Sequence, residues 1–149
     1  MAIPMKVYIK RIDKTLPLPV YYTEGSVGFD LYSRLDITIL PKTIYRIPTN
    51  LIIEVTPGYM LFVKDRSSTA AKGLFATAGI IDQDFCGPED EILFQVYNFK
   101  EEPVKISKGE RIAQGIFVQI AQATWQEEDV LPRTKNRGGF GSTGDQSIR

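Results

Sequence analysis

The chain has 149 residues, 43% of them hydrophobic, which suits one domain with a substantial core. Its 18 Lys and Arg residues balance 18 Asp and Glu residues, so bulk charge favours neither a nucleic-acid nor a membrane partner. The sequence contains no histidine, which excludes Ser–His and Cys–His nucleophiles and the usual histidine zinc sites. Any catalysis would therefore depend on carboxylates, Lys, Arg, backbone dipoles and a hard cation such as magnesium.

The remaining composition bears on the cellular compartment. A single cysteine, Cys86, excludes an intrachain disulfide and suits a reducing environment. No apolar run is long enough to span a bilayer, and the start lacks a secretory signal pattern. We therefore expect a cytoplasmic protein, or an intracellular one in a viral host.

Short alternating stretches separated by Pro and Gly turns predict an all-β sandwich or jelly roll. Residues 56–58, Thr-Pro-Gly, predict a hairpin between the strands on either side. In a later strand Ile92, Phe94 and Val96 alternate and should share one face. The other expected strands cover residues 6–10, 36–39, 45–47, 51–55, 59–63 and 112–120.

One short helix is expected over residues 67–72, with Gly73 as the C′ residue. Ser67 and Ser68 would expose hydroxyl and free N–H groups at its start, which together form a natural phosphate cradle. Arg66 adds a planar charged fork that suits phosphate oxygens. The alternative interpretation is an ordinary N-cap followed by an Ala-rich helix.

Residues 77–87 form a turn between two apolar arms, with glycines near both ends. Asp82 directly follows two isoleucines, and Phe85 comes three positions later. A carboxylate in such surroundings is costly to bury unless a ligand, water or metal uses its charge. A capped hairpin is an equally good reading of this stretch alone.

Two further polar positions could carry chemistry. Asp30 lies near the start of a strand that follows a glycine-flexible loop, where it could hold water on a cation or simply cap a turn. Gln114 is an amide inside a strongly apolar strand and could serve a core hydrogen bond as well as a ligand. Arg111, three residues earlier, would by default be a structural ion-pair partner.

The C-terminal stretch 138–144 places glycines around Phe140, Ser142 and Thr143. Its amides can wrap an anion while the ring stacks on a flat base, although it is no Walker motif. We expect a β-domain over residues 1–134 and a flexible tail over residues 135–149 that is ordered on binding. The alternative is a tail without function.

Taken in order, these stretches closely resemble the five motifs of the trimeric all-β dUTPase family. Each motif is weak alone, but five in order with compatible spacing are highly specific, and the match runs over most of the chain. The motifs are Gly28-Phe29-Asp30-Leu31, Arg66-Ser67-Ser68, Gly79-Ile80-Ile81-Asp82-Gln83-Asp84-Phe85, Gly109-Glu110-Arg111-Ile112-Ala113-Gln114 and Gly139-Phe140-Gly141-Ser142-Thr143-Gly144.

The resemblance implies a jelly-roll subunit in a homotrimer whose active sites are each built from three chains and closed by one C-terminal tail. The implied reaction is hydrolysis of dUTP to dUMP and pyrophosphate with Mg²⁺. Asp82 matches the carboxylate that activates the attacking water, and Phe85 matches an aromatic that packs under the deoxyribose. Uracil would be read by the backbone near Gly79.

The same resemblance assigns the phosphate end of the substrate. Phosphates would be held by Arg66, Ser67, Ser68 and Gln114, and Asp30 would reach magnesium through water. In the tail, the resemblance implies that Phe140 stacks over the uracil while Ser142 and Thr143 lie at the terminal phosphate. A gapless alignment puts Lys135 where the family has an arginine, but Arg137 is the only arginine there, and the interpretation favours Arg137.

Three departures from the family pattern concern the third motif and its turn. Phe85 stands where Tyr is common, Cys86 replaces a longer or polar residue, and the turn at residues 87–91 is about three residues longer. The longer turn gives some support to an alternative, the dCTP deaminase branch of the fold or its bifunctional members. A non-catalytic jelly-roll module that binds nucleotide is the alternative from another class.

Overall fold

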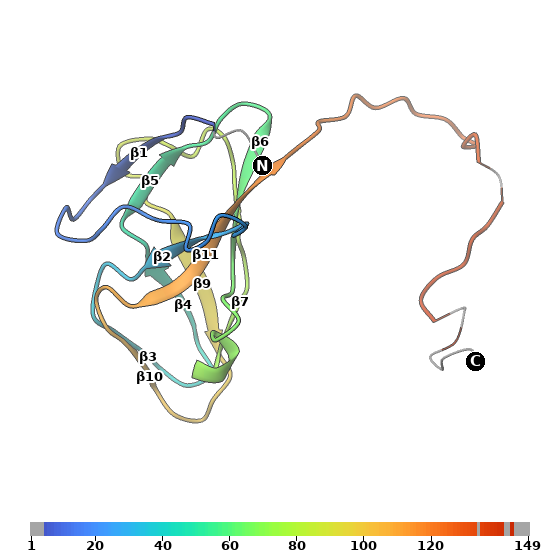
Figure 1. Ribbon diagram of the computed structural model, residues 1–149. Coiled ribbons are helices and arrows are strands. Elements are labelled where there is room, and N and C mark those ends of the chain that lie inside the picture. The colour runs from blue at the N-terminus through green and yellow to red at the C-terminus, as the bar shows by residue number, and fades with distance from the viewer. Residues whose placement is uncertain (1–4, 134, 142–143, 145–149) are drawn as a thin grey trace.

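The structure is a computed structural model that describes residues 5–133, 135–141 and 144 (Figure 1). This part of the chain is almost entirely β, as the sequence predicted, with a single turn of 3₁₀ helix, η1. The elements are β1 Tyr8–Arg11, β2 Phe29–Tyr32, β3 Ile37–Ile39, β4 Ile44–Pro48, β5 Leu51–Glu54, β6 Tyr59–Lys64, η1 Ala70–Lys72, β7 Leu74–Ala76, β8 Ile80–Ile81, β9 Leu93–Asn98, β10 Val104–Ile106 and β11 Arg111–Gln119.

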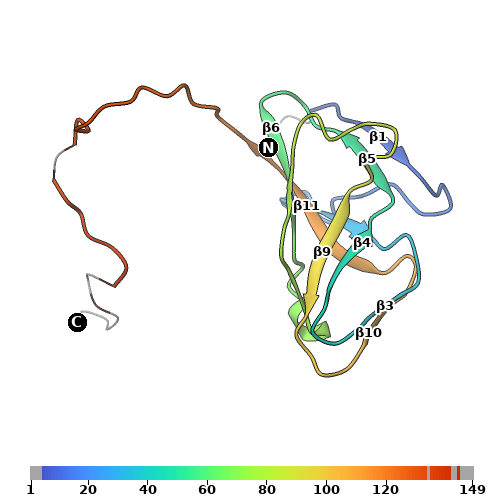
Figure 2. The same cartoon turned by 180° about the vertical axis from the view of Figure 1, so that it is seen from behind.

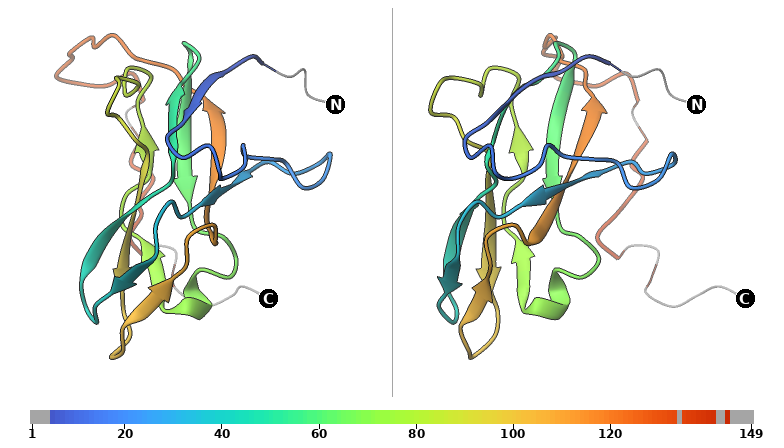
Figure 3. Two further views of the ribbon diagram at one scale, coloured as in Figure 1. Left: turned by 90° about the vertical axis from the view of Figure 1, so that its left-hand side faces the viewer. Right: turned by 60° about the vertical axis from the view of Figure 1, so that its left-hand side comes forward.

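The strands form a jelly-roll-like sandwich of antiparallel sheets, which confirms the predicted fold class (Figure 3). The largest sheet has the order β2-β11-β6-β8, and the facing sheet has the order β4-β9-β7. Two ribbons, β1-β5 and β10-β3, complete the body. Because neighbouring strands are far apart in sequence, the sheets bring the separate motifs together.

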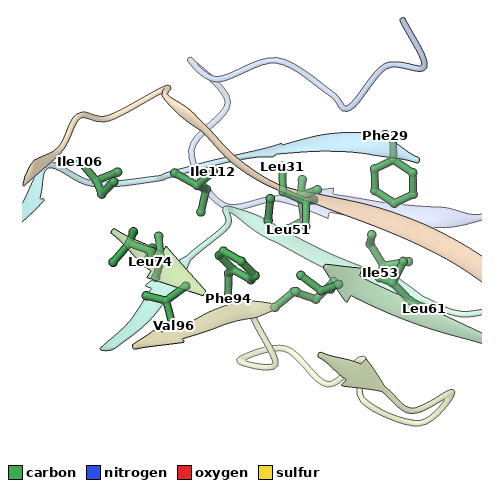
Figure 4. Close-up of a cluster of buried hydrophobic side chains, with 14 of the residues drawn as sticks. Phe29, Leu31, Leu51, Ile53, Leu61, Leu74, Phe94, Val96, Ile106 and Ile112 are labelled. Carbon is green, nitrogen blue, oxygen red and sulfur yellow. The ribbon is translucent and has the colours of Figure 1, made fainter. Parts of the chain in front are cut away.

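The core lies between these sheets (Figure 4). The predicted alternation in β9 is confirmed, since Phe94 and Val96 are fully buried together with Ile92 just before the strand. Leu31 and Leu61 reach the same core from the opposite sheet. This packing holds rigid the strand ends that carry the polar residues described below.

The predicted hairpin around residues 56–58 is wrong as a pairing, although the turn itself forms. The N–H of Tyr59 donates to the carbonyl oxygen of Thr56 at 3.1 Å, which closes the turn. The flanking strands then separate, because β5 pairs with β1 while β6 pairs with β11 and β8. The turn is thus a corner between two sheets.

The predicted helix at residues 67–72 is shorter than expected. It begins only at Ala70, so Ser67 and Ser68 lie in the preceding turn rather than at a helix start. Gly73 ends it in the left-handed conformation (φ 96°), as predicted for a C′ residue, and donates to the carbonyl oxygen of Ala70. The strands β7, β8 and β10 were not expected from the sequence.

Beyond β11 the chain leaves the sandwich (Figures 1 and 2). Residues 121–133 are all exposed, including Trp125 and Leu131. The domain boundary at residue 134 stays a prediction, since the last strand of the body already ends at Gln119. No helix among the described residues is long and apolar enough to cross a membrane.

Candidate active site

The predicted site residues of the body gather around two separate cavities. The arginine cavity is lined by Tyr22, Ser26, Val27, Gly28, Asp30, Arg66, Ser67, Arg111 and Gln114. The Asp82 cavity is lined by Arg46, Ala78, Gly79, Ile80, Ile81, Asp82, Phe85, Glu91, Leu93 and Gln95. The two sets share no residue, so a single chain divides the predicted site into halves.

Two guanidinium groups share one carboxylate in the arginine cavity. Arg66 donates from Nε to Oδ1 of Asp30 at 3.1 Å, and a terminal nitrogen of Arg111 lies 3.7 Å from Oδ2. Arg66 also donates from NH1 to the Arg111 carbonyl oxygen and to the Ser68 hydroxyl, both at 3.3 Å. Two cations and one largely buried anion leave a net positive charge, which suits a polyanion.

The turn at residues 66–69 is held from inside by Thr69. Its buried hydroxyl accepts the N–H of Arg66 at 2.9 Å, and its own N–H donates to the Arg66 carbonyl oxygen. Within the described part of the chain, the backbone N–H groups of Ser67 and Ser68 have no acceptor. The turn therefore presents free amides and hydroxyls beside the arginines, without needing a helix terminus.

Gln114 is half-buried on β11, and its amide is oriented by the fold. Its Nε2 donates to the carbonyl oxygen of Asp65 at 2.8 Å. A Cβ at Gly28 would lie only 2.5 Å from Oε1 of Gln114, so only glycine leaves room for this side chain. The predicted internal hydrogen bond is present, and Gln114 also lines the cavity, where contact with a ligand stays a prediction.

Tyr22 is a cavity residue that the sequence analysis missed. The Arg111 guanidinium lies 4.6 Å from the centroid of its ring, a cation–π distance. Tyr22 precedes the glycine-flexible loop at residues 25–28, and this proximity was the available signal. The ring of Tyr22 thereby limits the movement of Arg111, the second cation of the cavity.

Asp82 follows β8 at the rim of the other cavity. Its side chain is exposed and, within the part of the chain that the structure describes, has no hydrogen-bond or ion-pair partner. The N–H of Phe85 donates to the Asp82 carbonyl oxygen at 3.3 Å, which bends the chain so that both side chains line one cavity. The carboxylate thus shares the cavity with the apolar side chains of Ala78, Ile80, Ile81, Phe85 and Leu93.

Gly79 is required by the close approach of two backbones. The N–H of Val63 donates to the Gly79 carbonyl oxygen at 2.7 Å, and a Cβ at Gly79 would lie 2.1 Å from the Val63 carbonyl oxygen. This contact continues the pairing of β6 with β8 and sets the position of the cavity wall.

The polar side of the Asp82 cavity was also missed by the sequence analysis. Arg46 on β4 donates from Nε to Oε1 of Gln95 on β9 at 2.8 Å. Glu91 accepts two hydrogen bonds from Arg34, at 2.8 and 3.0 Å, and one from the N–H of Asn50. The bond to Glu91 raises the pKa of Arg34. No motif contains Arg46 or Gln95, which sheet pairing brings to the cavity, and Glu91 reaches it from the turn before β9.

The longer turn at residues 87–91 closes on itself. Asp90 accepts the N–H of Gly87 at 2.8 Å through Oδ2, and its own N–H donates to the Gly87 carbonyl oxygen at 3.1 Å. Its carboxylate is thus used within the turn. This agrees with an insertion that forms a surface bulge and gives no support to an added catalytic site.

The predicted tail residues stand apart from both cavities within one chain. Phe140 is fully exposed with a positive φ of 51°, and Arg137 donates to the carbonyl oxygen of Gly138 next to it. Ser142 and Thr143 lie outside the described residues. Roles for the tail residues stay predictions.

Comparison with known proteins agrees with this arrangement. The family model described as dUTPase matches residues 14–144. The chain belongs to the dUTPase family. The family predicted from the five motifs is therefore confirmed.

Relatives of this dUTPase-family chain carry one name. A protein of Dictyoglomus turgidum named deoxyuridine 5′-triphosphate nucleotidohydrolase is 40% identical over 148 residues, which cover 94% of this chain and 99% of that protein. One from Thermoanaerobacter with the same name is 41% identical over 152 residues, covering 97% and 99%.

Solved structures agree with the fold of this family member. A dUTPase of Streptococcus mutans superposes with a TM-score of 0.72 at 29% identity, covering 78% of this chain and 98% of that one. The dUTPase of Staphylococcus bacteriophage 80alpha with dUPNHPP superposes with a TM-score of 0.85, covering 94% and 99%. At 22% identity, the phage structure supports the fold alone.

Proposed function

We propose that this dUTPase-family chain hydrolyses dUTP to dUMP and pyrophosphate. The observation that carries the proposal is the exposed Asp82 carboxylate, which no described residue engages, at a cavity with largely apolar walls. The two other carboxylates that line the cavities are paired, Glu91 with Arg34 and Asp30 with Arg66 and Arg111. An unpaired carboxylate at a cavity is free to orient a water molecule and accept its proton.

In this scheme the arginine cavity holds the phosphates. Arg66 supplies planar donors, and the amides and hydroxyls of Ser67 and Ser68 add further ones. Gln114 borders the same space with its amide. Phosphoryl transfer needs chiefly charge neutralisation and in-line placement of the attacking water, so no histidine is required.

At the other cavity, Asp82 orients the water that attacks the α-phosphorus. Phe85 packs under the deoxyribose, where a ring leaves no room for a 2′-hydroxyl. The backbone near Gly79 reads the uracil. The family commonly has tyrosine at this position. Phe85 keeps the ring that forms this steric wall but lacks the tyrosine hydroxyl.

A complete site requires more than one copy of the chain. Along β6, Leu61 pairs with Ile81 and Lys64 pairs with Gln114, three residues further on. At about 3.3 Å per residue, this offset separates the two halves by about 10 Å along the strand, before the two strand spacings across the sheet are added. We therefore propose a homotrimer in which the arginine cavity of one subunit faces the Asp82 cavity of another.

The exposed C-terminal segment fits the same assembly. Because residues 121–133 are all exposed, the segment could reach a neighbouring subunit, where Phe140 would stack over the uracil. Arg137, rather than Lys135, would meet the γ-phosphate, and Ser142 and Thr143 would contact the same end. The tail would thereby exclude water other than the one that reacts.

Magnesium fits the arginine cavity only together with the substrate. Among the described residues, no three carboxylate or cysteine side chains gather to bind a metal ion. Asp30 is the one carboxylate lining that cavity and already neutralises two arginines, so it would hold the ion through water. When bound to the triphosphate, Mg²⁺ supplies neutralisation of the phosphate oxygens.

The test is pyrophosphate release from each deoxynucleoside triphosphate in the presence of Mg²⁺. We expect release from dUTP, and no ammonia from dCTP, which would instead indicate the deaminase branch. Asp82→Asn should lower turnover about a hundredfold to ten-thousandfold, because it removes the general base. Near-normal turnover in that variant would exclude the proposed role of Asp82.

A further inference from the structure

A row of polar side chains crosses the outer face of the β4-β9-β7 sheet and ends at the Asp82 cavity. Arg46 and Gln95 are register partners on β4 and β9, and the N–H of Thr77 donates to the Gln95 carbonyl oxygen at 3.0 Å. Their side chains are also linked. Arg46 Nε donates to Gln95 Oε1 at 2.8 Å, and Gln95 Nε2 donates to the Thr77 hydroxyl at 2.9 Å.

This row fixes the plane of the Arg46 guanidinium while leaving its charge uncompensated. Within the described residues, Arg46 has no carboxylate partner, and its two terminal nitrogens have no acceptor. The other arginine near the cavity, Arg34, is bound in a bidentate pair with Glu91. Arg46 therefore presents oriented donors to the cavity that it lines.

The position of the row decides which part of a nucleotide these donors meet. Thr77 and Gln95 lie next to Ala78 and Gly79, where the chain turns into β8. Asp82 lies beyond β8, at the other end of that two-residue strand. If Asp82 marks the α-phosphorus, Arg46 lies toward the base.

We propose that Arg46 contacts the pyrimidine and helps to select uracil over cytosine. This inference rests on the proposed hydrolysis of dUTP. Uracil offers a carbonyl oxygen at position 4, to which a terminal N–H of Arg46 donates. Cytosine carries an amino group at this position, so two donors would face each other there. An unpaired buried donor is costly, which disfavours the wrong base.

The experiment compares the wild type with Arg46→Leu and with the matched control Lys105→Leu. Lys105 is an exposed residue of β10 that lines neither cavity, so its variant removes the same charge at a remote place. For each protein, calorimetry measures the affinity for dUMP, and inhibition of dUTP hydrolysis measures the affinity for pyrophosphate. The ratio of kcat/KM for dUTP to that for dCTP is also measured.

In Arg46→Leu we expect the affinity for dUMP and the dUTP-to-dCTP ratio to fall about ten- to a hundredfold, with the affinity for pyrophosphate unchanged. Lys105→Leu should match the wild type. An unchanged dUMP affinity, or an equal weakening of pyrophosphate binding, would overturn the inference.

Two further comparisons keep the result interpretable. If Arg46→Leu does not fold, as judged by thermal melting and sedimentation, Arg46→Gln keeps a polar side chain and permits the same measurements. If the wild type releases no pyrophosphate, the proposed function fails, yet calorimetry with deoxyuridine, which carries no phosphate, still decides whether Arg46 contacts the base.

Discussion

The proposed division of the site between two chains predicts that two inactive variants can restore each other. Asp82→Asn damages the Asp82 cavity, and Arg66→Gln damages the arginine cavity. Because the cavities share no residue, each variant keeps the opposite half intact. In a trimer with cyclic symmetry, each site joins the arginine cavity of one subunit to the Asp82 cavity of the next.

The expected recovery follows from counting these junctions. A trimer that contains both variants has three sites, one at each contact between neighbouring subunits. One site combines two intact cavities, one combines two damaged cavities, and the third lies between identical subunits and has one damaged cavity. Mixed trimers should therefore show about one third of wild-type activity per trimer. Each variant alone should retain at most about one hundredth, since Asp82→Asn removes the general base and Arg66→Gln removes charged donors to the phosphates.

The assay uses co-expression with two different affinity tags. Purification on both tags in succession removes both homotrimers, and pyrophosphate release is then measured at saturating dUTP. As a control, Asp82→Asn carrying each of the two tags should remain silent after the same procedure. If both cavities of a site came from one chain, every site in a mixed trimer would contain one substitution. Mixed trimers no more active than the single variants would therefore refute the shared site.

Three predictions concern stability. Gly79→Ala should lower the free energy of unfolding by about 1–3 kcal/mol in a denaturant titration, since its Cβ would lie 2.1 Å from the Val63 carbonyl oxygen; unchanged stability would mean that β8 is not held as described. Glu91→Gln should cost about 2 kcal/mol in the same titration, because it breaks the bidentate pair with Arg34; a loss below about 0.5 kcal/mol would make the pair incidental. Hydrogen bonds from Lys108 and Thr15 lower the pKa of Asp13 below its ordinary 3.8, so its stabilising effect is complete above that pH and is lost as pH falls through the acid range. Asp13→Asn should therefore lower the melting temperature more at pH 7 than near pH 2, and an equal difference at both would contradict the linkage.

Periodicity predicted the strands whose side chains alternate over at least four residues. In β9, Phe94 and Val96 are buried while Gln95 and Tyr97, which alternate with them, are not, so the sequence pattern indicates both faces of the strand. The missed strands β7, β8 and β10 have two or three residues each, so an alternation in them is too short to distinguish a strand from a loop. Their pairing is imposed by longer neighbours such as β6 and β9.

The two wrong local predictions share a physical cause. Thr-Pro-Gly at residues 56–58 determines a turn, but the burial of apolar faces decides which strands pair afterwards. Ser67 and Ser68 favour a helix start by propensity, yet the buried Thr69 hydroxyl takes the N–H of Arg66 and holds these residues in a turn. The local sequence correctly predicted where the chain bends, whereas tertiary contacts determine which elements the bends connect.

Motifs predicted most residues that line the two cavities, because chemistry demands particular side chains at particular spacings. They could not predict Tyr22, Arg46 or Gln95, which no motif contains. These residues reach the cavities through sheet register and through a loop that folds over Arg111. Their contribution becomes visible only when the strands are placed side by side.

What the fold leaves unpaired is the strongest physical argument for where the substrate binds. Several other charged groups are paired, as Asp13 is with Lys108 and Glu110 with Lys72. In the part of the chain that the structure describes, unpaired carboxylates such as Asp84 and Glu54 are exposed and line neither cavity. Asp82 and the terminal nitrogens of Arg46 have no partner among the described residues. Such groups cost little while they face water, but once a neighbouring subunit covers them each must be satisfied or pay a large desolvation cost. In the proposed assembly, a nucleotide in the covered cleft would offer Arg46 a carbonyl oxygen and would place the α-phosphorus beside a water molecule bound to Asp82, so assembly and substrate binding should stabilise each other.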